Sequence, residues 1–507
     1  GVAVIARLLE DMGLRVGIIA QPNPRRVVDF TQLGEPRLFF GVTSGCSDSM
    51  LNNYSPTRRP RKIDNYSPGR LPGKRPDHAP IVYTRSLKEV FPNVPVILGG
   101  IEASLRRLAH FDFFDDEVKM SILAESGADL LVYGQGERTM REIVDELREG
   151  KGLSGCRKIR GVVWRASLDE KLEATVGEHT MVPSFEETVQ SKDAFYDMAK
   201  TNLHNMDPHF AKVLVQEHPN AYVVINKPQI PLSTAELDEV YELEYTRTPH
   251  PKYKKQGAIP AFETVKFSIM THRGCNAGCN FCPIYFHQGR YITSRSEENI
   301  VDEVEHVSKF HYFRNVISNV GGPVGNVYKS QCAKLDEGAE ADGACERPSC
   351  TYPDPCKNLT IDQKPYLDLL KQVLAVENVR QAFIASGVRY DLLEHDEHGQ
   401  ELLELLIERL SGRQFKTAVV HVSDSVNRRA GKYTTETTER FMDNCVSTVK
   451  KLGMDGDFEI IPYFTASHPG STMEDALDVA MFLKEHGLER IQIHDFVPTP
   501  GTASECM

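Results

Sequence analysis

The sequence predicts an α/β protein in which a doubly wound N-terminal domain is followed by a partial (βα)6 barrel. The first observation is that short apolar runs alternate with amphipathic stretches in both halves of the chain. The second is that glycine or proline bounds most of these runs, as is typical of buried parallel strands. The third is size, because 507 residues with 40% hydrophobic and 26% charged side chains suit about three folded domains.

The alternating pattern begins with a doubly wound domain that we place at residues 1–150. Its strand-like runs lie at 15–20, 37–42, 95–100 and 129–133. A helical pattern starts directly at Gly1, as expected of a chain cut from a larger protein. Gly99-Gly100 and Gly134-Gln135-Gly136 each follow a strand, where such glycines either let a ligand approach or only make the turn.

A basic loop at residues 57–75 interrupts this domain. It carries seven Lys or Arg side chains, and the motif NYSP occurs at residues 53–56 and again at 65–68. Arginine pairs with phosphate and tyrosine stacks on bases, so one interpretation is contact with a nucleic acid. The other interpretation is a solvated loop. The net charge of −12 restricts any nucleic-acid contact to a local patch.

Residues 151–264 are interpreted as a connector and hairpin region. The apolar run at 162–165 is typical of an edge hairpin, and residues 184–202 have a charged helical pattern. Prolines around 228–231 and 249–260 predict extended chain before the next domain.

A regular alternation of strands and helices over residues 265–507 predicts the barrel. Five amphipathic helices separate six apolar runs, which lie at 265–270, 315–320, 382–385, 417–422, 458–464 and 490–496. Ser294-x-x-Glu297 and Ser471-x-x-Glu474 are typical capping boxes at the starts of two helices. The chemistry of a parallel barrel lies beyond the carboxyl ends of its strands, so polar side chains there should face the mouth. None of them is assigned a catalytic role.

Three cysteines follow the first barrel strand, where Cys275, Cys279 and Cys282 are spaced C-x3-C-x2-C. Three thiolates on one loop can bind one metal centre. A structural zinc site needs a closed set of four ligands, whereas an iron–sulfur cluster held by three cysteines keeps one iron open for a ligand. We therefore predict an iron–sulfur cluster with a vacant iron.

Four further cysteines, Cys332, Cys345, Cys350 and Cys356, lie in an insert at residues 324–360. This segment can form little core, so an auxiliary iron–sulfur cluster or zinc would give it a reason to be ordered. The alternative is mobile thiols, including a reversible disulfide. Clustered thiols and the lack of any apolar run approaching 18 residues together indicate a cytoplasmic protein without a membrane segment.

These motifs resemble those of radical S-adenosylmethionine (SAM) enzymes, and more narrowly the YgiQ-type radical SAM proteins. RGCNAGCNFC at 273–282 is similar to the cluster motif of that superfamily. The agreement extends to HQGR at 287–290, SRS at 294–296, GGP at 321–323, SGVRYD at 386–391, SHPGST at 467–472 and PTPGT at 498–502. The resemblance covers nearly the whole chain and implies that the barrel is a radical SAM barrel. It also implies that the first strand of the domain at 1–150, which precedes Gly1 in YgiQ-type proteins, is missing here.

The resemblance implies a set of cofactor roles. SAM would chelate the open iron of a [4Fe-4S] cluster, and one electron from a donor such as a flavodoxin or ferredoxin would cleave SAM to a 5′-deoxyadenosyl radical. The backbone of Gly321, Gly322 and Pro323 would receive the methionine amino group, although proline stands where the superfamily motif has glutamate. Ser386 and Arg389 follow the third strand, where they would hold the ribose and the carboxylate of SAM.

The N-terminal domain also resembles the cobalamin-binding domains of some radical SAM methyltransferases. The sequence has no Asp-x-His-x-x-Gly loop for a cobalt-ligating histidine, so cobalamin is not expected. The leading hypothesis is a radical SAM enzyme whose substrate is unknown. The alternatives are a radical SAM methyl- or methylthio-transferase acting on RNA, and a non-catalytic iron–sulfur or zinc protein that senses redox state or binds nucleic acid.

Overall fold

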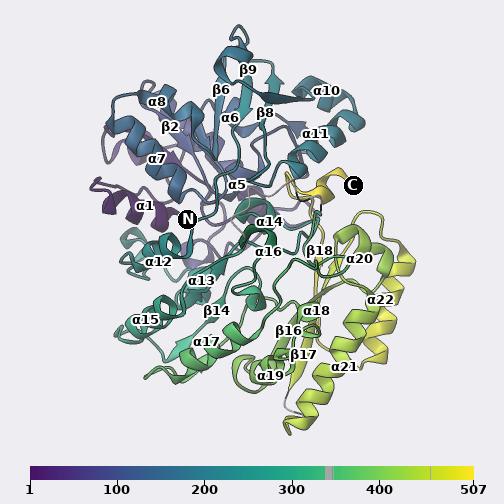
Figure 1. The fold of residues 1–507 in the computed structure, drawn as a ribbon. Helices are drawn as coiled ribbons and strands as arrows, with labels where there is room; N and C mark the ends of the chain where they lie inside the picture. The colour runs from purple at the N-terminus through teal and green to yellow at the C-terminus, as the bar shows by residue number, and fades with distance from the viewer. Residues whose placement is uncertain (337–344, 346, 457) are drawn as a thin grey trace.

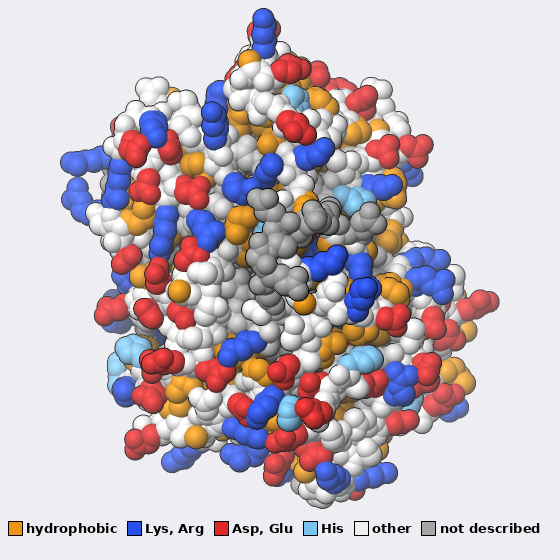
Figure 2. All heavy atoms as spheres, viewed as in Figure 1, with side chains coloured by type: hydrophobic (Ala, Val, Ile, Leu, Met, Phe, Trp, Pro, Cys, Tyr) orange, Lys and Arg blue, Asp and Glu red, His pale blue; other side chains and the backbone are white. Residues whose placement is uncertain are grey.

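The computed structural model describes residues 1–336, 345, 347–456 and 458–507. Figure 1 shows two units, with the N-terminal unit above and the barrel below. Acidic and basic side chains are intermixed over the face shown in Figure 2. Within the described residues, no helix combines the length and the hydrophobicity that a membrane crossing requires.

The N-terminal unit is built on a seven-stranded sheet. Its strands, in spatial order, are β1 (Phe40–Val42), β2 (Val96–Leu98), β5 (Leu130–Val132), β6 (Val162–Ala166), β9 (Ala221–Ile225), β8 (Val213–His218) and β7 (His179–Val182). Strands β1, β2 and β5 pair in parallel, whereas β6 is antiparallel to both β5 and β9. A short antiparallel hairpin, β3 (His110–Asp112) with β4 (Glu117–Lys119), stands outside this sheet.

Helices cover both faces of this sheet, which confirms the predicted doubly wound α/β class. One face packs against α4 (Ala79–Val90), α6 (Ile122–Ser126) and α11 (Lys192–His204). The other packs against α1 (Val2–Asp11) and α7 (Glu137–Arg148). Shorter helices in this unit are α2 (Val27–Thr31), α3 (Ser49–Asn53), α5 (Ile101–Leu105), α8 (Gly152–Gly155), α9 (Leu172–Thr175) and α10 (Phe185–Gln190).

The sheet does not end at residue 150, which differs from the predicted boundary. Residues 151–264, interpreted as a connector and hairpin region, supply four of its seven strands. The run at 162–165 is not an edge hairpin, because β6 lies between β5 and β9 with Trp164 only 2% exposed. Residues 15–20, predicted as a strand, are instead irregular chain that joins none of the ladders formed by the described residues.

The barrel has the six predicted strand positions. They are β10 (Ser268–Met270), the pair β13 (Val316–Ile317) and β14 (Asn319–Gly321), β15 (Gln381–Ala382), β16 (Gln414–Val420), β17 (Glu459–Ala466) and β18 (Gln492–Asp495). The pairs β10–β14 and β13–β15 and the trio β16–β17–β18 are all parallel. The predicted partial barrel is therefore present. Its strands are hydrogen-bonded as two pairs and one trio.

The outer layer of the barrel consists of amphipathic helices. They are α15 (Glu297–Ser308), α17 (Lys364–Ala375), α19 (Gly399–Leu405), α21 (Thr435–Lys451) and α22 (Met473–Glu485). Their buried faces, with the strands, form two apolar cores, and α22 packs in the smaller of the two. The starts differ slightly from the predicted capping boxes, since Ser296 caps α15 and Thr472 caps α22 with Asp475.

Shorter elements accompany the barrel. They are α12 (Thr234–Glu242), α13 (Pro260–Val265), α14 (Pro283–Gln288), α16 (Ala333–Asp336), α18 (Tyr390–Leu393), α20 (Asp424–Ala430) and the hairpin β11 (His272–Arg273) with β12 (Thr293–Ser294). Helix α14 contacts α5 and lies between the two units (Figure 1). The last turn of the chain, Ala503–Cys506, returns to pack against α11.

Candidate metal centre

The three predicted cluster cysteines lie together on the loop between β11 and α14. Cys275 is 6% exposed and Cys279 is 8% exposed, and both pack with Cys282 and Val324. The amide of Cys282 donates to the carbonyl of Cys279 at 3.2 Å. The loop is held from outside as well, because the Cys275 amide donates to the Gly289 carbonyl at 3.0 Å.

The electrostatics of the loop favour a bound metal over free thiols. Burial raises the pKa of Cys275 to about 12, and the neighbouring thiols of Cys282 and Cys279 contribute to that rise. Burial also raises the pKa of Cys282, and Cys279 adds to that rise. The thiols of Cys275 and Cys282 resist ionisation without a metal, and they would become stable thiolates if metal cations neutralised their charge. The donor set therefore fits an iron–sulfur cluster.

The spacing of the sulfurs points in the same direction. Among the described residues, the one group of His, Cys, Asp or Glu that places three ligand atoms within 4.8 Å of one another is His78, Asp112 and Asp115. The cysteine sulfurs are therefore more widely spread. A single tetrahedral zinc with bonds of about 2.3 Å would bring its sulfurs to about 3.8 Å from one another. A polynuclear cluster suits a wider set.

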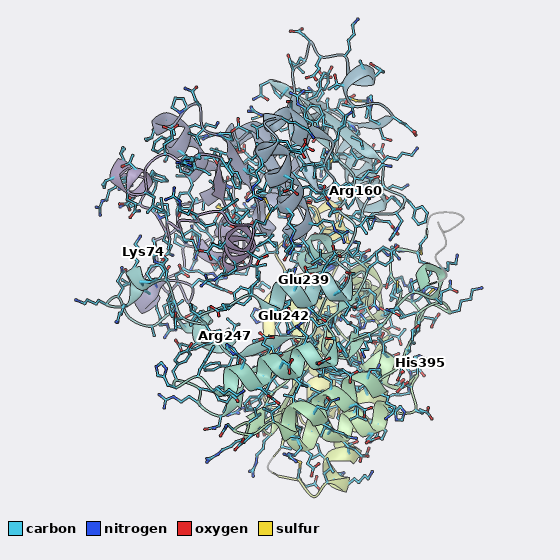
Figure 3. The ribbon with its side chains drawn as sticks, turned by 60° about the vertical axis from the view of Figure 1, so that its left-hand side comes forward. Lys74, Arg160, Glu239, Glu242, Arg247 and His395 are labelled. Carbon is cyan, nitrogen blue, oxygen red and sulfur yellow. The ribbon has the colours of Figure 1, made fainter. Side chains whose placement is uncertain are left out.

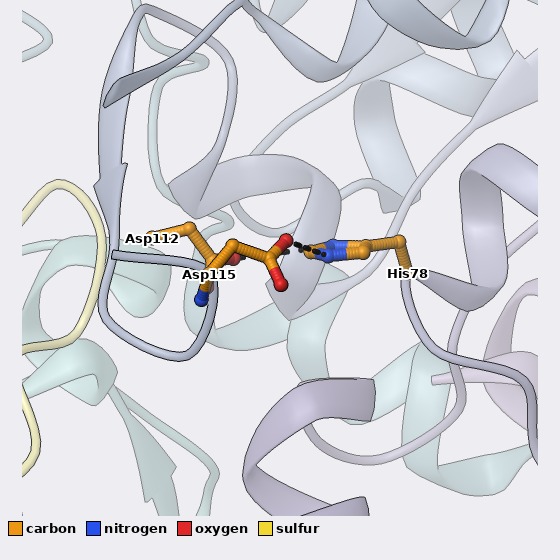
Figure 4. Close-up of side chains that lie close together, drawn as sticks. All are labelled: His78, Asp112 and Asp115. Carbon is orange, nitrogen blue, oxygen red and sulfur yellow. Dashed lines mark hydrogen bonds and ion pairs between the residues drawn. The ribbon is translucent and has the colours of Figure 1, made fainter. Parts of the chain in front are cut away.

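The group of His78, Asp112 and Asp115 is explained by hydrogen bonds and ion pairs (Figure 4). His78 Nε2 lies 2.9 Å from Asp115 Oδ2, and Lys119 Nζ lies 2.9 Å from the same oxygen. Asp112 Oδ2 pairs with Arg106 Nη2 at 3.1 Å. Because cationic side chains already neutralise both carboxylates, we do not interpret this group as a metal site.

The Gly-Gly-Pro turn lies beside the cysteine loop, as the resemblance implies. Strand β14 ends at Gly321, and Val324 just beyond the turn packs against the cysteines. Ser386 Oγ donates to the Gly322 carbonyl at 2.7 Å. A Cβ atom on Gly322 would lie 2.5 Å from His272 Nε2, so glycine is needed at this close approach.

Arg389 is placed at the same site, 3% exposed. Its guanidinium pairs with Asp391 at 2.5 and 2.9 Å and lies 4.5 Å from the ring centroid of Tyr433. The remaining nitrogen, Nη1, is buried and has no hydrogen-bond partner among the described residues. A buried donor without a partner is costly, so this nitrogen is available to an anionic ligand.

Several residues of the site were not predicted from the sequence. Asn326 holds the Arg389 backbone in place by accepting from its amide at 2.7 Å and donating to its carbonyl at 3.0 Å. His272 packs beneath Gly322, and burial lowers the pKa of its imidazole to about 4. Lys432 is 6% exposed and donates to Tyr433 Oη at 3.1 Å. His272 could have been noticed in the sequence because it directly precedes the cysteine motif. No local sequence pattern identifies Asn326 or Lys432 as residues of the site.

The glycine turns of the N-terminal sheet face α14. The Gln135 side chain donates to the Gln288 carbonyl at 2.9 Å, and His287 Nδ1 lies 3.1 Å from Ser104 Oγ. A Cβ atom on Gly134 would lie 3.5 Å from the His287 carbonyl. The carboxyl ends of β2 and β5 therefore meet the segment that follows the cysteine loop.

Part of the basic loop at 57–75 is engaged within the protein. Arg58 pairs with Asp116 at 2.9 Å and stacks on Phe113, and buried Arg75 lies 3.5 Å from Asp64. Other basic side chains of the loop are exposed, namely Arg59, Lys62, Arg70 and Lys74. Lys74 lies at the outer edge of the molecule in Figure 3. Contact with a nucleic acid stays a prediction.

Comparisons with known proteins agree with this geometry. Residues 1–268 match the family described as "Radical SAM N-terminal", and residues 269–483 match the "Radical SAM superfamily". The chain is 43% identical over 507 residues to a UPF0313 protein of Methanocella arvoryzae, covering all of this chain and 82% of that protein. It is 44% identical over 508 residues to a UPF0313 protein of Clostridium perfringens, covering 100% of this chain and 75% of that protein.

A solved structure has a similar fold. The radical SAM methyltransferase TsrM from Kitasatospora setae, with cobalamin and a [4Fe-4S] cluster bound, aligns with a TM-score of 0.54 at 14% identity. The alignment covers 99% of this chain and 73% of that chain. Because that protein of similar fold holds cobalamin, the comparison does not support the expectation that cobalamin is absent here.

Proposed function

This chain belongs to the radical SAM superfamily and, within it, to the UPF0313 family, and from that premise we propose that it cleaves SAM reductively at a [4Fe-4S] cluster. Membership of the superfamily implies an enzyme. The observation that supports the reaction is the buried trio Cys275, Cys279 and Cys282, with sulfurs spread more widely than a single ion needs. The cluster, when bound, supplies one-electron chemistry that converts SAM to methionine and a 5′-deoxyadenosyl radical.

The residues around the trio support a position for SAM. The Gly321-Gly322-Pro323 turn offers backbone carbonyls to the methionine amino group, and Ser386 Oγ fixes the turn by donating to the Gly322 carbonyl at 2.7 Å. The unpartnered Nη1 of Arg389 suits the methionine carboxylate, since a guanidinium paired with a carboxylate is a strong hydrogen bond. In this proposal Ser386 positions the turn, and its contact to the ribose is secondary.

A second candidate is methyl or methylthio transfer to RNA. It is favoured by the fold that the chain shares with the methyltransferase TsrM and by the exposed basic side chains of the loop at 57–75. Cobalamin binding belongs to this candidate. Both candidate reactions need an electron donor such as a flavodoxin or ferredoxin. Clustered thiols of this kind suit a protein of the reducing cytoplasm.

The test is to reconstitute the full chain anaerobically with iron and sulfide, reduce it with dithionite and add SAM. We expect 5′-deoxyadenosine to form, and we expect Cys279→Ala to lower its rate by at least about 100-fold because one cluster ligand is lost. Cys46→Ala removes an exposed thiol outside the site and serves as the matched control.

Other products would identify the alternatives. S-adenosylhomocysteine, particularly after addition of hydroxocobalamin, would support methyl transfer. A fully loaded protein that never cleaves SAM, and whose binding to RNA changes with Cys279→Ala, would refute the proposal in favour of a non-catalytic iron–sulfur protein.

A further inference from the structure

Backbone contacts join the described parts of the insert between β14 and α17 that carry its four cysteines. Cys332 forms a β-bridge with Leu359, and the Thr360 amide donates to the Gln331 carbonyl at 2.9 Å. The Cys356 amide donates to the Cys350 carbonyl at 2.8 Å. These backbone bonds bring the two ends of the insert together, with Cys332 at one paired end and Cys356 close to the other.

A single arginine contacts two of these sulfurs. Arg290 Nη2 lies 3.6 Å from Cys345 Sγ and 3.7 Å from Cys350 Sγ, and it also donates to the Arg347 carbonyl at 3.0 Å. Burial raises the pKa of Cys350 although Arg290 acts against it, and Cys345 and Cys356 add to the rise. Two thiols therefore lie against one guanidinium, and Cys356 is close enough to Cys350 to affect its pKa.

This arrangement favours negative charge on the sulfurs. Arg290 is 9% exposed, and its nearest carboxylate oxygen, on Asp207, lies 3.8 Å from Nη1. Neutral thiols are weak acceptors and would leave a buried guanidinium poorly solvated, whereas metal-bound thiolates would complement it. A disulfide between Cys345 and Cys350 would also remove that negative charge.

The insert lies directly on the loop of the first cysteine trio. The Cys350 amide donates to the Asn276 carbonyl at 3.0 Å, and Ser349 Oγ donates to the Ala277 carbonyl at 2.5 Å. Tyr285, in α14, donates to the Pro348 carbonyl at 3.2 Å. An ordered insert would therefore brace the loop that carries Cys275 and Cys279.

We propose that Cys345, Cys350 and Cys356, with Cys332 as the fourth thiol, hold a second iron–sulfur cluster, and that Arg290 donates hydrogen bonds to its ligand sulfurs. Iron is favoured over a single zinc because, among the described residues, no three of these sulfurs lie within 4.8 Å of one another. The sulfurs of the first trio also exceed this spacing. This second site does not depend on the reaction proposed above.

The test compares four reconstituted full-length proteins by iron, sulfide and zinc content and by electron paramagnetic resonance. They are the unaltered protein, the triple variant Cys275→Ala/Cys279→Ala/Cys282→Ala, the double variant Cys345→Ala/Cys350→Ala and the control Cys46→Ala. We expect the triple variant to retain about half of the iron and sulfide, with a reduced signal that SAM does not change. We expect the double variant to keep the SAM-sensitive signal and to lose the other half.

Two measurements keep the proposal testable if a variant fails to fold. The unaltered protein should bind about eight irons per chain, and about four would overturn the proposal. In the triple variant, Arg290→Gln should shift the potential of the remaining cluster to more negative values without changing its iron content, because hydrogen bonds to ligand sulfurs stabilise the reduced state. Zinc in the insert, or a disulfide between its cysteines found by mass spectrometry, would also overturn it.

Discussion

Individual buried polar side chains in this protein differ in how far their hydrogen bonds are satisfied. Arg295 is fully buried, and its guanidinium donates to Asn299, to the Met270 carbonyl and to Glu303. His218, at the end of β8, is also buried, yet neither ring nitrogen has a partner among the described residues. Burial without a partner favours the neutral form of the His218 imidazole.

Substitution of His218 tests whether its buried neutral imidazole makes the stability of the protein depend on pH. Burial lowers the pKa of His218 to about 4, so between pH 6.5 and 4 the unfolded chain binds a proton that the folded chain does not. Stability should therefore fall as the pH falls through this range, by up to about 3 kcal/mol at pH 4. His218→Phe should flatten this dependence, because a phenyl ring can keep the stacking on Phe185 at 5.8 Å without titrating.

Urea unfolding at pH 7 and pH 5 would measure the effect. The control is His395→Gln, which removes an exposed histidine at the surface of the barrel unit (Figure 3) and should leave the pH dependence unchanged. If His218→Phe and the unaltered protein lost stability equally between the two pH values, the claim that His218 is neutral in the folded protein would be refuted.

At the scale of elements, a single glycine sets the contact between the insert and the cysteine loop. Gly278 has φ +62°, and a Cβ atom there would lie 2.4 Å from the Pro348 carbonyl and 3.1 Å from Ser349. Both neighbours are backbone or short side-chain atoms that cannot rotate away. The insert and the loop can therefore approach each other only while residue 278 has no side chain.

Gly278→Ala should separate these two elements. We expect it to lower the iron retained after gel filtration and to reduce SAM cleavage by more than about 10-fold, because displacement of a cluster ligand loop by about 1 Å is costly to catalysis. Gly127→Ala is the matched control, since Gly127 has φ +77° and, among the described residues, no atom lies within 4 Å of where its Cβ would be. That substitution should cost only about 1–2 kcal/mol of backbone strain. Equal effects of the two substitutions would contradict the role of this contact.

Element positions were more predictable than element boundaries. All six barrel strands form where apolar runs lie. For the first five the reason is burial, since a buried parallel strand is apolar on both faces, whereas β18 is exposed along its whole length. Helix starts were displaced by one or two residues, because Ser294 and Ser296 have equal local capping potential and only tertiary packing selects Ser296. The place of β6 in the middle of a sheet depends on partners from residues 221–225, which no local pattern identifies.

At the scale of the whole molecule, the cysteine loop is held between the two units. Arg273, two residues before Cys275, pairs with Glu137 at the start of α7 at 2.5 Å. The sequence located both the cysteine motif and the glycine turn that precedes Glu137, because each is a local pattern. It could not show that they meet, since contacts over 136 positions leave no periodic signal.

Substitutions in the Arg273–Glu137 pair measure how strongly this contact couples the two units. Both side chains are nearly buried, so Arg273→Met or Glu137→Met alone would leave one charge without its partner and should cost about 3–5 kcal/mol of stability. The double variant should recover most of that loss, because two apolar side chains can replace a buried pair at little cost. The loop begins two residues after Arg273, so SAM cleavage should fall in each single variant and return in the double variant. Additive losses in denaturant unfolding would show that the pair does not couple the units, and that the loop is positioned by the barrel alone.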